Sequence, residues 1–333
     1  MKYIKPILIS TTLLAPVFSY GLAVSNPDAL AKESGFGGYI GLMTGYSSSN
    51  NQMIADNDNK DYNGENSNAD NMNNALILPY LALNYTFDGL QDQIFLRNYS
   101  AENFILAQDS TVELGYTHLF ANKTKATFSI LGLGLDQDAW KNPYKVGKRD
   151  KTHASIMGFR GKFENIYNSG IGLDLAYGKY KLKDEESPNL DYMDRNSKVF
   201  FSELSYLMKL SNDFYWRNAI SYEKNSADGK AMSFNGYGYK TSFIFNDIMG
   251  GVLSTNLSYE NRKYGDEIMV NSLPQEKRKD NRYKIDVNYA EAGLFGYESL
   301  AGTVALGYEK QDSNIDFYSF TQPSIMVGAA YTF

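Results

Sequence analysis

A histidine and a serine stand two residues apart, at a spacing that suits base-activated acyl transfer. The sequence has only two histidines, His118 and His153, and Ser155 follows the second. Alternate residues of a strand point to the same face, so the imidazole of His153 and the hydroxyl of Ser155 would lie side by side. A histidine in this position activates a serine hydroxyl as a nucleophile. His118 falls on a different predicted strand, so the two histidines are not expected to cooperate.

A second pattern with chemical potential lies in the polar segment 47–74, which is dense in Asn, Asp and Ser. Residues 59–64 read Asn-Lys-Asp-Tyr-Asn-Gly and approximate a calcium loop, in which alternate oxygens bind the ion and the glycine makes the turn. Asn59 stands where the first acid is expected, and Asp70 where the final glutamate is expected. We interpret the segment as a solvated loop, because its composition does not support a packed core. No metal or other cofactor is predicted.

Composition excludes several other classes of function and favours strands. The sequence has no cysteine, so neither a disulfide framework nor thiol chemistry is expected. Its formal net charge of -6 gives no bulk attraction for nucleic acid. Tyr, Phe and Gly number 27, 19 and 28, whereas Pro numbers 8. This inventory is typical of a chain rich in strands and aromatic side chains.

The N-terminal segment has the pattern of a secretory signal peptide. Lys2 and Lys5 form a positive region, the following stretch is mostly apolar as far as Val24, and Gly21-Leu22-Ala23 offers small residues for cleavage. Ala29-Leu30-Ala31 is a second candidate cleavage site. The predicted domains are a signal peptide over residues 1–23, with cleavage as late as residue 31 as the alternative, and a β-barrel over residues 32–333.

The rest of the chain consists of segments in which apolar and polar residues alternate. A tilted membrane strand needs about 10 residues to cross an apolar band of about 25 Å. Fourteen segments fit: 36–46, 75–87, 93–99, 111–120, 124–135, 152–163, 170–182, 198–210, 214–224, 237–246, 252–264, 283–289, 299–311 and 322–333. They predict an all-β fold, a single transmembrane antiparallel β-barrel of about 14 strands. The short segment 93–99 and the irregular connection 290–298 leave 12 or 16 strands as alternatives.

The lengths of the connections predict which side of the membrane each end of the barrel faces. Tight turns such as 211–213 alternate with long polar loops such as 47–74 and 136–151. Outer-membrane barrels have short periplasmic turns and long extracellular loops, so both chain ends are expected in the periplasm. Trp140 lies in the 136–151 loop and is expected to anchor it. We predict a protein of the cell outer membrane of a Gram-negative bacterium, in contact with outer-membrane lipid.

Charged side chains must face the interior of such a barrel, because an Arg or Lys facing lipid at mid-bilayer costs about 2 to 4 kcal/mol. The predicted lumen-lining cations are Arg97, Lys125, Arg160, Lys162, Lys209, Arg217, Lys240 and Lys284, and the anions are Glu113, Asp174, Glu203, Glu223, Glu260, Asp286 and Glu309. Their near balance predicts weak ion selectivity. Fourteen strands give a lumen roughly 15 Å wide, which opposed pairs of side chains do not fill.

The final predicted strand, 322–333, has a continuous apolar face that ends on two aromatic residues. Ile325, Val327 and Ala329 share this face with Tyr331 and Phe333. An aromatic residue at the end of the last strand is the feature by which the barrel assembly machinery recognises its clients. Tyr331 and Phe333 are therefore the predicted C-terminal assembly signal, and that machinery is a predicted partner.

Three segments are distinctive in sequence: DQDAWKNPYKVGKRDKT at 136–152, ADGKAMSFNGYGY at 227–239 and SNIDFYSFTQPSIMVGAAYTF at 313–333. They resemble an uncharacterised family of porin-like outer-membrane β-barrel proteins from marine Gram-negative bacteria, which carries a domain-of-unknown-function label. The resemblance covers residues 34–333 and implies an outer-membrane barrel with no assigned activity. His153-Ala154-Ser155 also matches the His-x-Ser spacing of outer-membrane phospholipases, but the Asn-Gly that follows the serine there is missing.

The predicted function is a porin-like channel for small solutes through a lumen of mixed charge. The alternative is a non-channel surface barrel whose outer loops bind a ligand or partner. An outer-membrane lipid hydrolase that uses His153 and Ser155 is a remote alternative, and the protein is predicted not to be an enzyme.

Overall fold

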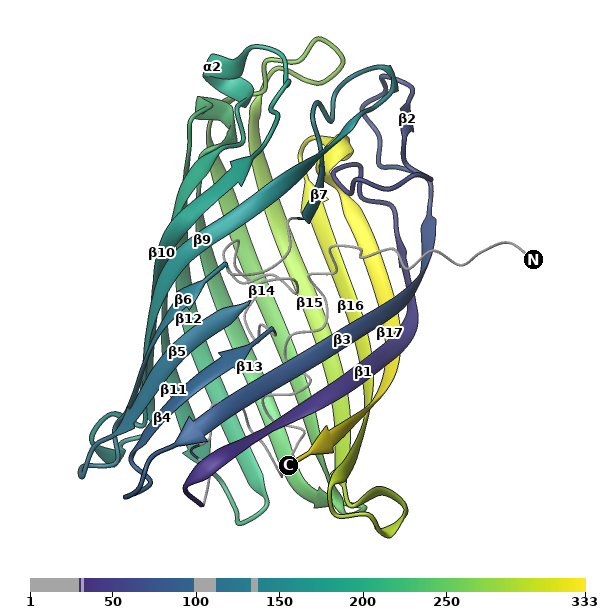
Figure 1. The fold of residues 1–333 in the computed structure, drawn as a ribbon. Coiled ribbons are helices and arrows are strands. Elements are labelled where there is room, and N and C mark those ends of the chain that lie inside the picture. The colour runs from purple at the N-terminus through teal and green to yellow at the C-terminus, as the bar shows by residue number, and fades with distance from the viewer. Residues whose placement is uncertain (1–29, 31–32, 99–111, 133–136) are drawn as a thin grey trace.

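The computed structural model describes residues 30, 33–98, 112–132 and 137–333. These residues form an all-β fold in which fourteen antiparallel strands close into one barrel (Figure 1). No helix among them is long and apolar enough to cross a membrane. The predicted signal peptide lies outside the described residues and stays a prediction, and the ends of three predicted strands, at 99, 111 and 133–135, lie outside them too.

The barrel wall follows the order of the sequence. Its strands are β1 (Gly35–Ser49), β3 (Met72–Thr86), β4 (Asp92–Arg97), β5 (Glu113–Leu119), β6 (Lys125–Leu131), β9 (Lys151–Glu164), β10 (Ile171–Leu182), β11 (Ser197–Lys209), β12 (Phe214–Ala227), β13 (Phe234–Ile248), β14 (Gly251–Glu267), β15 (Lys277–Ala292), β16 (Leu300–Ser313) and β17 (Phe320–Thr332). Because β17 pairs with β1, each strand has a partner on both sides. A closed wall satisfies backbone polar groups that lipid cannot. The predicted count of fourteen strands is confirmed.

The remaining elements lie in the connections between the barrel strands. On the outer side are β2 (Asp61–Tyr62), β7 (Gln137–Trp140), β8 (Gly147–Lys148), α2 (Leu190–Met193), η2 (Lys230–Met232) and η4 (Asp316–Tyr318). On the periplasmic side, the described residues form the short turns η1 (Ile166–Asn168) and η3 (Leu294–Gly296). β2 pairs with β8, and β7 pairs with the outer end of β9. The predicted alternation of short periplasmic turns with long outer loops is confirmed.

Several strands are longer than the sequence pattern predicts, and β15 shows why. The predicted strand 283–289 is too short, because β15 runs from Lys277 to Ala292. The missed outer end is rich in charge, which is typical of a loop. In the structure Arg278 and Asp280 are buried while Lys277 and Lys279 are exposed, so the charges alternate between the two faces without interrupting the strand.

The two faces of the wall differ as predicted for a barrel in lipid. Along β17, Ile325, Val327 and Tyr331 are exposed, whereas Ser324 and Met326 are buried. Exposed apolar side chains recur at alternate positions around the whole barrel, including Phe36, Ile40, Leu42 and Tyr46 of the first strand. An outward apolar face and an inward polar face are what a bilayer requires of a barrel.

Candidate solute passage in the barrel lumen

The predicted lumen charges all fall at inward positions of the wall, on the parity opposite to the exposed apolar side chains. The buried ones are Arg97, Glu113, Arg160, Asp174, Glu203, Glu223, Lys284, Asp286 and Glu309, and the half-buried ones are Lys125, Lys162, Arg217, Lys240 and Glu260. Lys209 shares their parity but is exposed, because it lies at the periplasmic end of β11.

Most of these charges are paired between neighbouring strands rather than across the lumen. Arg97 Nε lies 2.7 Å from Glu113 Oε2, and Arg160 Nε lies 2.9 Å from Asp174 Oδ1. Both pairs join residues of adjacent strands that are buried at 7% exposure or less. Breaking such a pair would leave one charge buried without compensation, which costs about 3 to 5 kcal/mol. The pairs therefore hold the charges flat against the wall.

The largest network of paired charges runs across β12, β14, β15 and β16. Arg262 reaches Glu260 Oε1 at 2.8 Å and Glu223 Oε2 at 3.0 Å. Arg282 reaches Glu309 Oε1 at 3.1 Å and Glu260 Oε2 at 3.7 Å. Glu260 thus links the two arginines into one chain of charges on the lumen wall.

Sequence reasoning missed Arg262, Arg278, Asp280 and Arg282, although all four belong to this inward charged face. They lie at the outer ends of β14 and β15. Arg262 lies within the predicted strand 252–264, whereas the other three residues lie in the loop predicted between residues 264 and 283. A signal was present, because Arg278, Asp280 and Arg282 continue the parity of Lys284. Extending the period of two beyond the predicted strand would have found them.

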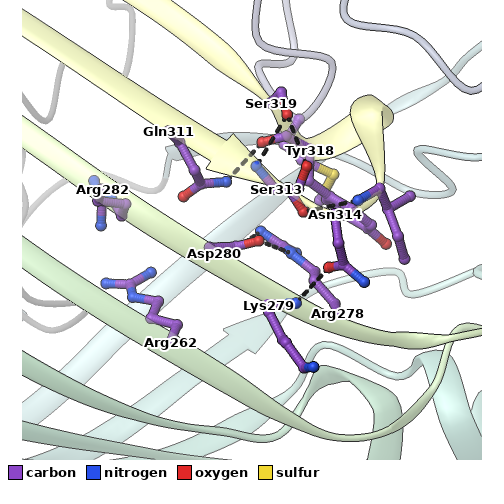
Figure 2. A network of polar contacts seen from close by, with 12 residues as sticks. Arg262, Arg278, Lys279, Asp280, Arg282, Gln311, Ser313, Asn314, Tyr318 and Ser319 are labelled. Atoms are coloured by element: carbon purple, nitrogen blue, oxygen red, sulfur yellow. Dashed lines mark hydrogen bonds and ion pairs between the residues drawn. The ribbon is translucent and has the colours of Figure 1, made fainter.

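At the outer end of the wall, residues of β15 and β16 contact the loop between β16 and β17, as Figure 2 shows for the residues that it labels. The guanidinium carbon of Arg278 lies 3.6 Å from the centroid of the Tyr318 ring and 4.4 Å from that of Tyr264. Its Nε donates to Asp280 Oδ1 at 2.9 Å, and Gln311 Nε2 donates to the backbone oxygen of Tyr318 at 2.6 Å. Stacking and hydrogen bonds thus tie the 314–319 loop to the wall.

An outer cap of packed loops lies at the mouth of the barrel. We define it as the buried apolar cluster Tyr62, Tyr144, Met193, Ala231, Met232, Ile268, Val270, Leu273, Ile315, Phe317 and Tyr318, to which six outer connections contribute. The hydroxyl oxygens of Tyr144 and Tyr318 lie 2.8 Å apart. Their loops rise from opposite parts of the wall, with β10 to β15 between them, so this contact crosses the mouth. In Figure 1 the loops gather above the end of the barrel where α2 and β2 lie.

A buried arginine organises one side of the outer cap. Arg149 is fully buried, and its Nη1 donates to the backbone oxygens of Gln52 and Pro143 at 3.1 and 3.0 Å. Its guanidinium carbon lies 4.5 Å from the ring centroid of Trp140. Burial lowers the pKa of Arg149 to about 10, so the group stays charged near neutral pH. Carbonyl oxygens and aromatic faces therefore stabilise a cation that lies inside an apolar cluster.

Trp140 anchors its loop, as the sequence predicted. Its side chain is fully buried, and its indole Nε1 donates to the backbone oxygen of Gln52 at 3.2 Å. The segment around it is not irregular, however, because Trp140 ends the short strand β7. The β1–β3 loop and the β6–β9 connection are therefore joined at Gln52, to which both Trp140 and Arg149 donate.

The two other chemical patterns do not assemble into sites among the described residues. His153 and Ser155 are exposed on β9, where His153 Nδ1 lies 3.5 Å from Asp138 Oδ1 and Ser155 Oγ donates to the Lys181 backbone oxygen at 3.4 Å. Asn59 turns its amide nitrogen toward loop carbonyls, and no cluster of acidic, His or Cys side chains suited to a metal occurs in the described part of the chain.

The C-terminal aromatic residues lie at the periplasmic rim, where the wall closes. Tyr331 and Phe333 are both exposed, and their ring centroids are 6.4 Å apart. The backbone of Phe333 exchanges two hydrogen bonds with Gly38 of β1, at 3.0 and 3.1 Å. Phe36, at the start of β1, is 86% exposed on the same rim.

The match to a family model agrees with this architecture. A family described as a protein of unknown function, DUF2860, matches residues 35–332. This chain belongs to that family. The match spans every strand of the barrel of this DUF2860 protein, which is an outer-membrane β-barrel.

No curated protein matches this DUF2860 chain. Its fold is similar to that of the outer-membrane channel DcaP of Acinetobacter baumannii, with 11% identity, 92% of this chain and 99% of that chain covered, and a TM-score of 0.43. It is also similar to the outer-membrane protein OprD from Pseudomonas aeruginosa, with 9% identity and a TM-score of 0.38. That match covers 98% of this chain and 97% of the OprD chain. A Pseudomonas aeruginosa FadL homologue matches at 9% identity with a TM-score of 0.42. That match covers 98% of this chain and 99% of the homologue.

Proposed function

We propose that this protein is a porin-like channel through which small solutes cross the outer membrane, and that the outer cap gates it. The observation that carries the proposal is the inward face of the wall, where charges are paired between adjacent strands on both sides of the barrel. Charges arranged in this way leave the middle of a fourteen-strand lumen to water and solutes. Mixed charge along the wall favours weak ion selectivity.

Gating by the outer cap follows from how its parts are held together. Apolar side chains of the cap are almost fully buried, and each contributes roughly 1.5 to 3 kcal/mol by leaving water. The cap therefore obstructs the mouth at rest. Its members come from separate loops, so the cap can open without breaking the hydrogen-bonded wall.

The contact between Tyr144 and Tyr318 across the mouth also favours the second candidate function, a closed surface barrel whose outer loops bind a ligand or partner. In that case the outer cap would be a permanent structural layer, and the charges of the lumen would serve stability alone. The two candidates differ in one measurable property, which is ionic current through the purified barrel.

The test is planar-bilayer conductance of the wild type and of Phe317→Ala. Phe317 is fully buried, with ring centroids 5.3 and 5.4 Å from those of Tyr62 and Tyr144, so its truncation costs the outer cap about 3 to 5 kcal/mol. We expect discrete current steps in the wild type and a several-fold higher open fraction in the variant. Phe200→Ala, on the outward face of β11, is the matched control and should behave as the wild type.

Absence of current above the lipid background in both the wild type and Phe317→Ala would reject the channel and favour the closed surface barrel. Current in the wild type with no increase in the variant would reject gating by the outer cap. Lipid hydrolysis by the same preparation, lost on Ser155→Ala, would instead support the enzyme alternative.

A further inference from the structure

Five polar side chains form a continuous patch on the lumen face of β13, β14 and β15. We define the polar patch as Ser242, Ser254, Asn256, Asp286 and Asn288, which are between 0% and 4% exposed. Ser242 lies opposite Asn256 in the register, Asn256 lies opposite Asp286, and Ser254 lies opposite Asn288. The patch therefore covers two adjacent rows of the wall, an area of about 10 by 7 Å.

The patch faces the lumen rather than lipid. Leu257 and Ile285 are the chain neighbours of Asn256 and Asp286, and both are exposed on the outward face. Strand geometry then points Asn256 and Asp286 inward. The rows lie on the periplasmic side of Lys240, Ser258 and Glu260, which line a pocket of about 60 Å³ in the same wall.

The side chains of the polar patch do not satisfy one another. Buried atoms without a hydrogen-bond partner include Ser242 Oγ, Ser254 Oγ, Asp286 Oδ1, and both the nitrogen and the oxygen of the side-chain amides of Asn256 and Asn288. Native proteins rarely leave buried polar atoms unpaired, and five neighbouring residues carry seven such atoms here.

The facing part of the wall shows that polar pairs in this barrel can satisfy one another. On β5 and β6, the hydroxyls of Thr117 and Thr127 lie 2.9 Å apart. On β3 and β4, Gln93 Nε2 donates to Thr86 Oγ1 at 3.0 Å. These two pairs thus bond across strands, whereas the buried atoms of the polar patch, although on the lumen-facing side of the wall, have no such partner.

We propose that the polar patch binds a neutral solute rich in hydroxyl groups, a sugar or a polyol. A hydroxyl group both donates and accepts, and vicinal hydroxyls match the paired donor and acceptor of each asparagine amide. Asp286 Oδ1 accepts from a further hydroxyl, while Lys284 Nζ lies 3.5 Å from Asp286 Oδ2 and compensates the charge. Because the site has no unbalanced charge, it favours neutral solutes over ions.

This inference rests on the proposed channel for access of the solute to the lumen, but its test does not depend on current. The purified barrel in detergent is titrated with glucose, sucrose and sorbitol, and binding is read by saturation-transfer difference NMR. A short oligoethylene glycol of matched size, which accepts hydrogen bonds but has no vicinal hydroxyls, is the control solute. We expect saturable binding of at least one sugar or polyol and none of the glycol.

The variant Asn256→Leu/Asn288→Leu removes four of the unpaired atoms at nearly constant side-chain volume. We expect an affinity loss of about ten-fold or more. Ser258→Ala is the matched control, because Ser258 lies on the same face of β14 two residues from Asn256 and contributes no unpaired buried atom. Conductance of each protein is measured in parallel.

Equal signals from sugars and glycol, or sugar binding that survives Asn256→Leu/Asn288→Leu, would overturn the proposal and leave the channel intact. Sugar binding lost in this variant but kept in Ser258→Ala would support it, whether or not the barrel conducts. Absence of current with patch-dependent binding would reject the channel alone.

Discussion

The barrel wall and the outer cap are held together by different interactions. Strands of the wall are joined by continuous backbone ladders, and inward ion pairs such as that of Arg97 with Glu113 link neighbouring strands. The loops of the outer cap are joined by the short β2–β8 ladder and by single backbone bonds, and the cap also depends on buried apolar side chains such as Phe317 and on the buried cation of Arg149. We infer from this difference that, in the proposed channel, the cap opens while the wall stays closed.

The largest effect is expected where the wall closes, at Phe333. We propose that the barrel assembly machinery recognises the aromatic side chain there, so Phe333→Ala should lower the amount of assembled barrel in the outer membrane several-fold. Phe36→Ala alters the same rim without touching the last strand and is the control. Heat-modifiable mobility on gels measures the assembled fraction, and equal losses in both variants would argue against a specific signal.

In the outer cap the largest effect is expected from Arg149→Met. The change removes the donor to the backbone oxygens of Gln52 and Pro143 and should destabilise the cap by about 3 kcal/mol without lowering the melting temperature of the wall. Hydrogen exchange should rise in the outer loops only. Lys145→Met, in the same loop but at an exposed ion pair, should change little. Loss of the whole barrel in Arg149→Met would mean that cap and wall fold as one unit.

A smaller effect is expected from Glu260→Gln in the charged wall. Glu260 contacts Arg262 and Arg282, so its neutralisation leaves the lumen more positive and should shift the permeability ratio toward anions by about two-fold. The reversal potential under a salt gradient measures this ratio. Asp312→Asn, exposed on the outward side of β16, should leave it unchanged, and a shift in that control would place the selectivity outside the lumen.

The smallest effect is expected from Tyr144→Phe in the outer cap. It removes one hydroxyl from the contact with Tyr318, a loss of about 1 kcal/mol, and should raise the open fraction modestly. Combining it with Tyr318→Phe should add less than the sum of the two single changes, because both remove the same bond. Strictly additive effects would show that the hydroxyls do not interact in the membrane.

The wall could be predicted from the sequence because its signal is local. Alternation over about ten residues identifies each strand, and lipid forces apolar residues outward at every second position. The same local rule failed at the outer end of β15, where Arg278, Asp280 and Arg282 are charged enough to be read as a loop. It failed there because a strand that continues beyond the lipid no longer needs an apolar face.

The outer cap could not be predicted from the sequence because its contacts join distant loops. Tyr62 packs against Phe317, and Arg149 bonds to Gln52, across long separations in the sequence. No periodicity connects such positions. Trp140 was the one residue whose type gave a signal, since a large aromatic in a polar loop has to be buried somewhere.

The sandwich of Arg278 between Tyr264 and Tyr318 has a consequence for the electrical behaviour of a single molecule. It fastens one loop of the outer cap to the wall, whereas the loops that carry Met193 and Val270 are joined to each other through Asn189 and to the backbone of residues 140–141 through Arg195. The loops would therefore leave the mouth one after another, with the 314–319 loop last. Current through one barrel would then rise in several steps of unequal size, and the fully open current level would be the rarest.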